Sequence, residues 1–134
     1  MIVDTTVFVY SLLHVEPLHE QAGQTIDAVD RIIVPDSFWA EFTSAVWQWV
    51  RAERLSLDEA LDVLDRVAAI VAEEVESKSL RERALVLAAE ADHAPYDTLF
   101  AALAEQEGTQ VITYDERFRQ AFPDLTISPA DFLA

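Results

Sequence analysis

Two aspartates of the sequence have the type and position that metal-assisted hydrolysis requires. Asp4 follows a short apolar segment at the N-terminus, and Asp115 comes just after the β-branched segment 111–113. If both segments are strands of one parallel sheet, the two carboxylates point into the crevice beyond the carboxyl ends of the strands. Each Asp also precedes a helical stretch, so capping of that helix is the alternative explanation.

Asp97 and Glu41 come from two predicted helices. Asp97 lies in the first turn of an apolar segment, residues 95–104, and faces its small residues, where an acid must be paired, capped or bound to a metal. A favourable interaction with the helix dipole is the alternative at this position. Glu41 lies just outside the apolar arc of segment 36–53, where its side chain reaches either a cleft or bulk water.

Four carboxylates in one crevice repel one another. A pair about 4 Å apart costs on the order of 1 kcal/mol in water and about 4 kcal/mol at an effective dielectric of 20, which protons or a cation must offset. The chain has no Cys, and its three His residues show no ligand spacing. Oxygen ligands favour Mg²⁺ or Mn²⁺, which activate water and stabilise an in-line phosphoryl displacement. Thr6 and Thr113 are placed to offer hydroxyl groups to water or phosphate.

Short β-branched segments alternate with helical periodicity along the chain. We predict buried strands at residues 1–4, 31–35 and 110–114, a short last strand at 126–127 and a weak one near Val75. We predict helices at residues 18–29, 36–53, 57–72, 80–91 and 95–107. Strands separated by helices, with few hairpin signals, predict an α/β fold with a parallel sheet covered by helices.

Residue types at the ends of these segments support the helix boundaries. Asp36 or Ser37 is the expected cap of segment 36–53, and Ser56 with Glu59 has the spacing of a capping box. Gly108 stands where the helix at 95–107 should end. With no repeat, linker or low-complexity stretch, we expect one domain over residues 1–134.

The formal net charge of −16 bears on function. Such a chain repels nucleic acid as a whole, which disfavours a simple RNA-binding module but disfavours less an enzyme that reaches phosphates through a bound metal. A solubilising acidic surface is the simplest explanation for most of the acids.

No apolar run approaches the roughly 20 residues that cross a bilayer, and the N-terminal segment is a poor signal peptide. We expect a cytoplasmic protein with no membrane partner.

Four motifs follow one another along the chain: I-V-D-T-T at residues 2–6, P-D-S-F-W-A-E at 35–41, P-Y-D-T-L-F-A-A-L-A at 95–104 and V-I-T-Y-D-E-R-F at 111–118. No single motif is specific. Their combination, in this order and spacing, resembles the PIN-domain nucleases, and within them the VapC-type toxins of toxin–antitoxin pairs. The resemblance extends from Met1 to about Phe118 and so covers nearly the whole chain.

This resemblance implies a three-layer fold, with a central parallel sheet of about five strands flanked by helices, and an Mg²⁺- or Mn²⁺-dependent endoribonuclease. The family's catalytic and metal-binding acids match Asp4, Glu41, Asp97 and Asp115, and its catalytic hydroxyl position matches Thr113. The resemblance also implies an RNA substrate, a homodimer and a cognate antitoxin that blocks the site.

Three more polar residues are expected to support this site. Thr6 matches a polar position near the first Asp. Ser44 stands three residues after Glu41, where these proteins often carry Asn, and its shorter side chain reaches less far. Arg117 is a candidate partner for phosphate or for one of the acids.

Two rival functions fit parts of the pattern. A phosphatase or phospho-acceptor domain also gathers Asp at strand ends, but here Thr6 stands where a second acid would follow Asp4, and Lys78 is not placed to bind phosphate. A non-catalytic acidic interaction module is the other rival, and loss of metal binding on mutation of Asp4 or Asp97 would distinguish it from a nuclease.

Aromatic and histidine residues offer weaker signals. Segment 36–50 is apolar over most of its circumference, which core packing on two sides explains; alternatively, Trp39 or Trp47 contacts an antitoxin or a second subunit. That hypothesis fails if both are fully buried in the monomer. His14, His19 and His93 are interpreted as ordinary surface or boundary residues.

Overall fold

Five short parallel strands form the centre of the protein. The computed structural model describes all 134 residues. The strands are β1 (Ile2–Val3), β2 (Ile33–Pro35), β3 (Glu73–Val75), β4 (Val111–Ile112) and β5 (Thr126–Ile127), and their order in the sheet is β3-β2-β1-β4-β5. Every pairing is parallel, as the alternation of strands and helices predicts. The expected three-layer α/β fold is confirmed.

The strand order reverses at β1. The chain moves outward from β1 to β2 and β3, then returns to place β4 on the other side of β1. Ile2 pairs with Val111 and Val3 with Ile112, so β1 and β4 end at the same level of the sheet. Residues that follow these two strands therefore meet at the switch point, where open α/β sheets form their ligand crevices.

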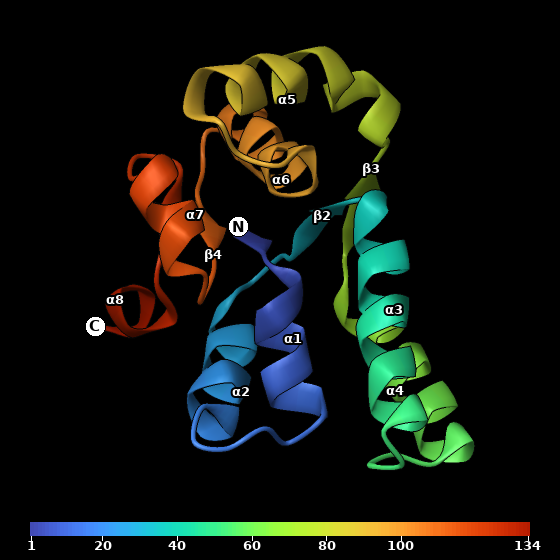
Figure 1. The fold of residues 1–134 in the computed structure, drawn as a ribbon. Helices are drawn as coiled ribbons and strands as arrows, with labels where there is room; N and C mark the ends of the chain where they lie inside the picture. The colour runs from blue at the N-terminus through green and yellow to red at the C-terminus, as the bar shows by residue number, and fades with distance from the viewer.

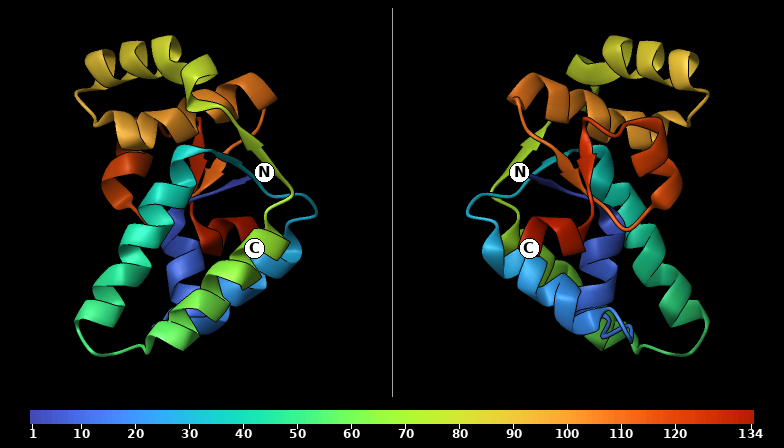
Figure 2. Two further views of the ribbon diagram at one scale, coloured as in Figure 1. Left: turned by 90° about the vertical axis from the view of Figure 1, so that its right-hand side faces the viewer. Right: turned by 90° about the vertical axis from the view of Figure 1, so that its left-hand side faces the viewer.

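Seven helices connect the strands and an eighth follows β5 (Figure 1): α1 (Thr5–Leu12), α2 (His19–Ala28), α3 (Ser37–Arg51), α4 (Leu57–Ile70), α5 (Ser77–Ala91), α6 (Pro95–Glu107), α7 (Glu116–Ala121) and α8 (Pro129–Leu133). Helix α6 packs across β2, β1 and β4, and α5 lies against its outer side. Figure 2 shows α5 and α6 stacked above the strands, while α3 and α4 form a hairpin that extends below them. None of the helices combines the length and apolar character of a membrane span.

A continuous apolar core joins the sheet to the helices. The helix α6 contributes Phe100 and the run Ala101–Ala104, all buried, which agrees with the apolar character of this segment. Phe38 of α3 stacks on Phe42 with ring centroids 5.6 Å apart and packs against Phe8 of α1 at 5.0 Å. These rings hold α3 against α1, and so set the position of every residue on α3 relative to β1.

No bounds are predicted for α1, α7 and α8. The predicted boundaries of the other elements are close to the observed ones, with one informative exception. Helix α5 begins at Ser77, three residues before the predicted start, because the carboxylate of Asp36 accepts the backbone N–H of Ser77 at 3.0 Å. Asp36 or Ser37 is the predicted cap of α3; Asp36 occupies the N-cap position, but its side chain makes no cap bond there. The expected capping box at Ser56 and Glu59 and the left-handed end of α6 at Gly108 are both present.

Candidate active site

Asp4 lies at the centre of the site, between the end of β1 and the start of α1. Its backbone N–H donates to the carbonyl of Ile112 at 3.0 Å, which continues the β1–β4 ladder by one residue. Its side chain is 7% exposed and caps α1 by accepting the N–H of Thr5 at 2.8 Å. The second carboxylate oxygen accepts the hydroxyl of Thr113 at 2.7 Å. Capping and site formation are thus two roles of one residue.

Thr113 connects the ends of β1 and β4. Its buried hydroxyl donates to Asp4 and accepts the backbone N–H of Asp115 at 3.0 Å. Asp115 in turn caps α7 by accepting the N–H of Phe118 at 3.1 Å. The chain of hydrogen bonds holds two predicted acids at neighbouring strand ends, as the sheet register requires.

Glu41 reaches the site from α3. Its carboxylate accepts the hydroxyl of Thr5 at 3.0 Å, and Thr5 directly follows Asp4. This contact joins α3 to α1 at the level of the strand ends. Glu41 thus turns toward the crevice rather than bulk water, which decides between the two possibilities that its position in the sequence left open.

Asp97 comes from the first turn of α6 and is paired with His93. The Nε2 atom of His93 lies 2.7 Å from Oδ2 of Asp97. The His93 side chain is only 8% exposed, and its ring stacks on Phe118 with centroids 5.5 Å apart. His93 is a boundary residue, as predicted, but not an ordinary one, since its ring is packed in place and pairs with one of the predicted acids. The spacing of four residues between His93 and Asp97 is the feature of the sequence that could have predicted this pair.

Burial and mutual repulsion make Asp4, Glu41 and Asp97 resist ionisation. Desolvation is the largest cause in each case: it raises the pKa of Asp4 to about 6 and that of Glu41 to about 7, and it also raises the pKa of Asp97. The charges of Asp97 and Asp115 add to the increase at Asp4, and those of Asp4 and Asp97 add to it at Glu41. Hydrogen bonds from Thr113, Thr5 and His93 act in the opposite direction. The four acids are therefore close enough to sense one another.

The chemistry of this cluster fits a divalent cation with a preference for oxygen. A cation beside the buried carboxylates would offset both the repulsion and part of the desolvation that raise their pKa values. No three His, Asp or Glu side chains are already arranged as a metal site. Each of the four carboxylates instead has a hydroxyl, amide or imidazole partner. The residues that could hold the ion are Asp4, Glu41, Asp97 and Asp115.

The remaining expected site residues occupy different positions around this cluster. The hydroxyl of Thr6 is buried without a hydrogen-bond partner, whereas Thr5, which the sequence did not single out, makes the contacts to Asp4 and Glu41. Arg117 is exposed at the N-terminal end of α7, and its charge lowers the pKa of Asp97. Ser44 is exposed one turn beyond Glu41 on α3, in the wall of a hollow that Glu41 also lines.

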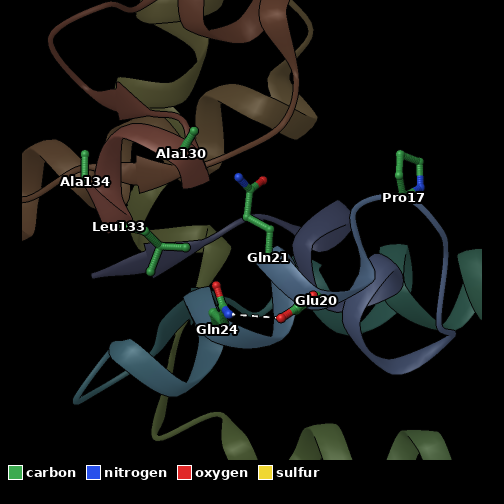
Figure 3. Close-up of a pocket in the computed structure, with 7 residues that line it drawn as sticks. All are labelled: Pro17, Glu20, Gln21, Gln24, Ala130, Leu133 and Ala134. Carbon is green, nitrogen blue, oxygen red and sulfur yellow. Dashed lines mark hydrogen bonds between the residues drawn. The ribbon is translucent and has the colours of Figure 1, made fainter.

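Two other surfaces bear on partners. Trp47 is 54% exposed on α3, so Trp39 and Trp47 are not both buried, and a partner contact at this position is not excluded. A separate hollow of about 440 Å³ lies between α2 and α8 (Figure 3). Its lining includes Gln21, Gln24 and Glu20 but none of the four carboxylates, so it is not part of the candidate active site.

The geometry agrees with a comparison against known protein families. The sequence model of the PIN domain matches residues 1–122. The chain belongs to the PIN domain family. Members of this family are typically nucleases, and the match covers all four acids of the site. No curated protein sequence is similar enough to this PIN domain to count as a relative.

Two solved structures share the fold of this PIN domain. PAE2754 from Pyrobaculum aerophilum superposes with a TM-score of 0.76 at 21% identity, over 98% of this chain and 85% of the other. A toxin–antitoxin complex from Klebsiella pneumoniae gives a TM-score of 0.67 at 17% identity, over 96% of both chains. At these identities the similarity concerns the fold.

Proposed function

We propose that this PIN-domain protein is an Mg²⁺- or Mn²⁺-dependent endoribonuclease and the toxin of a toxin–antitoxin pair. One observation carries the nuclease proposal: the carboxylate of Asp4 is buried close to those of Asp97, Asp115 and Glu41, and its burial, with smaller contributions from the charges of Asp97 and Asp115, raises its pKa to about 6. A bound cation would offset the repulsion and desolvation of these carboxylates. A divalent cation would also supply the charge stabilisation and activated water that phosphodiester hydrolysis needs.

The protein's own residues supply position and proton exchange. Thr113 and the N–H of Thr5 fix the Asp4 carboxylate, and His93 fixes that of Asp97. Burial raises the pKa of Glu41 to about 7 in the metal-free protein, so Glu41 would release this proton when a cation binds, and its ionised carboxylate could then hold the ion. Arg117, exposed near Asp97, is placed to attract a phosphate into a site that is otherwise strongly acidic.

The toxin role, the VapC-type branch, the homodimer and the antitoxin rest on the motifs and on the fold shared with the Klebsiella toxin–antitoxin complex. Exposed apolar side chains on the α3–α4 hairpin support a partner surface, since Trp47, Leu57 and Leu61 are each more than half exposed. An antitoxin segment that covers them would bury apolar area close to the helix that carries Glu41.

Metal-dependent RNA cleavage is the direct test. The wild-type protein is incubated with a pool of single-stranded and structured RNA in Mg²⁺, Mn²⁺ or EDTA, beside Asp97→Asn and the matched control Asp62→Asn, an exposed position on α4. We expect cleavage that needs the metal, disappears in Asp97→Asn and persists in Asp62→Asn. Well-folded protein that neither cleaves RNA nor binds Mn²⁺ would instead favour the non-catalytic interaction module.

The toxin role needs a separate measurement. Expression in a bacterial host should arrest growth, and Asp97→Asn should relieve the arrest at equal protein level. Cleavage in vitro without growth arrest would support the nuclease function and contradict the role as a toxin.

A further inference from the structure

A hollow of about 460 Å³ opens beside Glu41, between α3 and the first turn of α6. Its lining residues are Ala40, Glu41, Ser44, Ala45, Gln48 and Tyr96. Because Glu41 belongs both to this wall and to the carboxylate cluster, the hollow adjoins the proposed active site. We call it the α3–α6 groove.

Tyr96 gives the groove an exposed aromatic face. At 70% exposure it is the most exposed large apolar side chain of the protein, and it directly precedes Asp97 on α6. Most other aromatic side chains of the protein pack into or against the core. An aromatic ring left open at the mouth of an acidic site is a surface on which a flat ligand can stack.

The rest of the groove indicates what kind of ligand fits. It contains no Lys, Arg or His, and its one carboxylate is Glu41, so a phosphate or another anion would be repelled there. Ala40 and Ala45 are small and leave room, whereas Gln48 and Ser44 offer hydrogen-bond donors and acceptors. Open space, a stacking ring and a polar edge suit an uncharged, flat ring system that carries its own donors and acceptors.

We propose that the α3–α6 groove is a nucleobase-binding subsite, in which Tyr96 stacks on the base of a nucleotide next to the scissile phosphodiester while Gln48 and Ser44 contact the edge of that base. The proposal rests on the nuclease function proposed above and adds to it a means of recognising single-stranded RNA. Single strands present unstacked bases that proteins bind on aromatic side chains. In this acidic protein, stacking would also replace part of the phosphate attraction that a basic surface normally supplies.

The test compares variants of Tyr96 in RNA binding and in cleavage. Tyr96→Ala removes the ring, Tyr96→Phe keeps it, and Leu85→Ala is a matched control at an apolar position on α5 that is 65% exposed. Binding of fluorescein-labelled single-stranded RNA oligonucleotides of each base is followed by anisotropy with Ca²⁺ in place of Mg²⁺. Cleavage of the best substrate is measured with and without an abasic nucleotide at each position flanking the cut.

We expect Tyr96→Ala to weaken RNA binding about 10-fold or more and to raise KM more than it lowers kcat, because stacking acts mainly on substrate binding. Tyr96→Phe and Leu85→Ala should bind like the wild type. On the abasic substrate that lacks the stacked base, the difference between Tyr96→Ala and the wild type should disappear. Gln48→Ala should change the preference among the four bases.

Several results would overturn the subsite. If the wild type cleaves RNA and Tyr96→Ala binds and cleaves equally well, the subsite is absent while the nuclease function stands. If Tyr96→Ala changes a dimer into a monomer without changing RNA affinity, the groove is an interface between two copies of the chain. If the well-folded wild type neither binds nor cleaves RNA in any of these assays, the subsite and the nuclease function fail together.

Discussion

Neutralising Asp4 should stabilise the metal-free protein while it destroys the proposed metal site. The carboxylate is 7% exposed, and its burial is the main reason that its pKa rises from 3.8 to about 6. The charges of Asp97 and Asp115 raise the pKa further, against the hydrogen bonds from Thr113 and Thr5. Above pH 6 and without a cation, Asp4 is therefore ionised in the folded protein, where the charged carboxylate has a higher free energy than in the unfolded chain.

The pKa of Asp4 determines how much its ionisation lowers the free energy of unfolding, and over which pH range. At 1.36 kcal/mol per pKa unit, the change from 3.8 to about 6 corresponds to about 3 kcal/mol. The folded state binds this proton more tightly than the unfolded chain, so the contribution of Asp4 to the stability of the wild type is greatest below pH 3.8. That stability is lost as the pH rises, and the loss is complete above pH 6.

Asp4→Asn removes the charge and keeps an oxygen that can cap α1, because Asn is as good an N-cap as Asp. We expect its free energy of unfolding in EDTA at pH 8 to exceed that of the wild type by up to about 3 kcal/mol. The gain should be roughly half as large at pH 5, where the wild-type carboxyl is mostly protonated in the folded state. The Thr113 hydroxyl loses an ionised acceptor in the variant, which reduces the gain.

Urea unfolding at pH 5 and pH 8, in EDTA and then in Mn²⁺, measures these differences. Mn²⁺ at 100 times its Kd should stabilise the wild type by about 2.7 kcal/mol, and it should leave Asp4→Asn almost unchanged. The exposed control Asp62→Asn should stay within about 0.5 kcal/mol of the wild type in EDTA. The reasoning is refuted if Asp4→Asn is no more stable than the wild type at pH 8 in EDTA, or if Mn²⁺ stabilises both proteins equally.

Three further substitutions test other parts of the site and its support. His93→Ala should weaken Mn²⁺ binding about 10- to 100-fold in titration calorimetry, because the Asp97 carboxylate loses the hydrogen bond that orients it. His93→Gln should restore part of the affinity. Thr113→Val should lower the free energy of unfolding in EDTA at pH 8 by about 1–3 kcal/mol, because Asp4 loses its buried donor. Phe38→Ala should cost about 3–5 kcal/mol in urea unfolding, since its fully buried ring joins α3 to α1.

Each of these three predictions has a contrary result. Equal Mn²⁺ affinity for His93→Ala and the wild type would leave the imidazole with a packing role only. Unchanged stability of Thr113→Val would mean that Asp4 finds another donor. A loss below about 1 kcal/mol for Phe38→Ala would show that α3 is held to the core mainly by other contacts.

The sequence by itself determined the fold class and the approximate place of the acids. Short β-branched segments between helical segments predict a parallel sheet, and the strand near Val75 is recognisable even though β3 is mostly exposed. Residues that follow parallel strands lie at one edge of the sheet, which is why Asp4 and Asp115 could be expected together before any contact was known. Local capping signals likewise place the ends of α4 and α6 within a residue or two.

Only the tertiary structure decided which side chains pair within the site. Thr113 reaches Asp4 across 109 residues because β4 lies beside β1 in one register, and Thr5 rather than Thr6 binds Glu41 because α3 packs against α1 at one angle. Asp36 caps α5 rather than its own helix for the same reason. Local sequence specifies backbone conformation, whereas strand order, register and helix packing bring distant segments into contact. The pKa values of the acids depend on that contact and on burial, so they too belong to the folded protein.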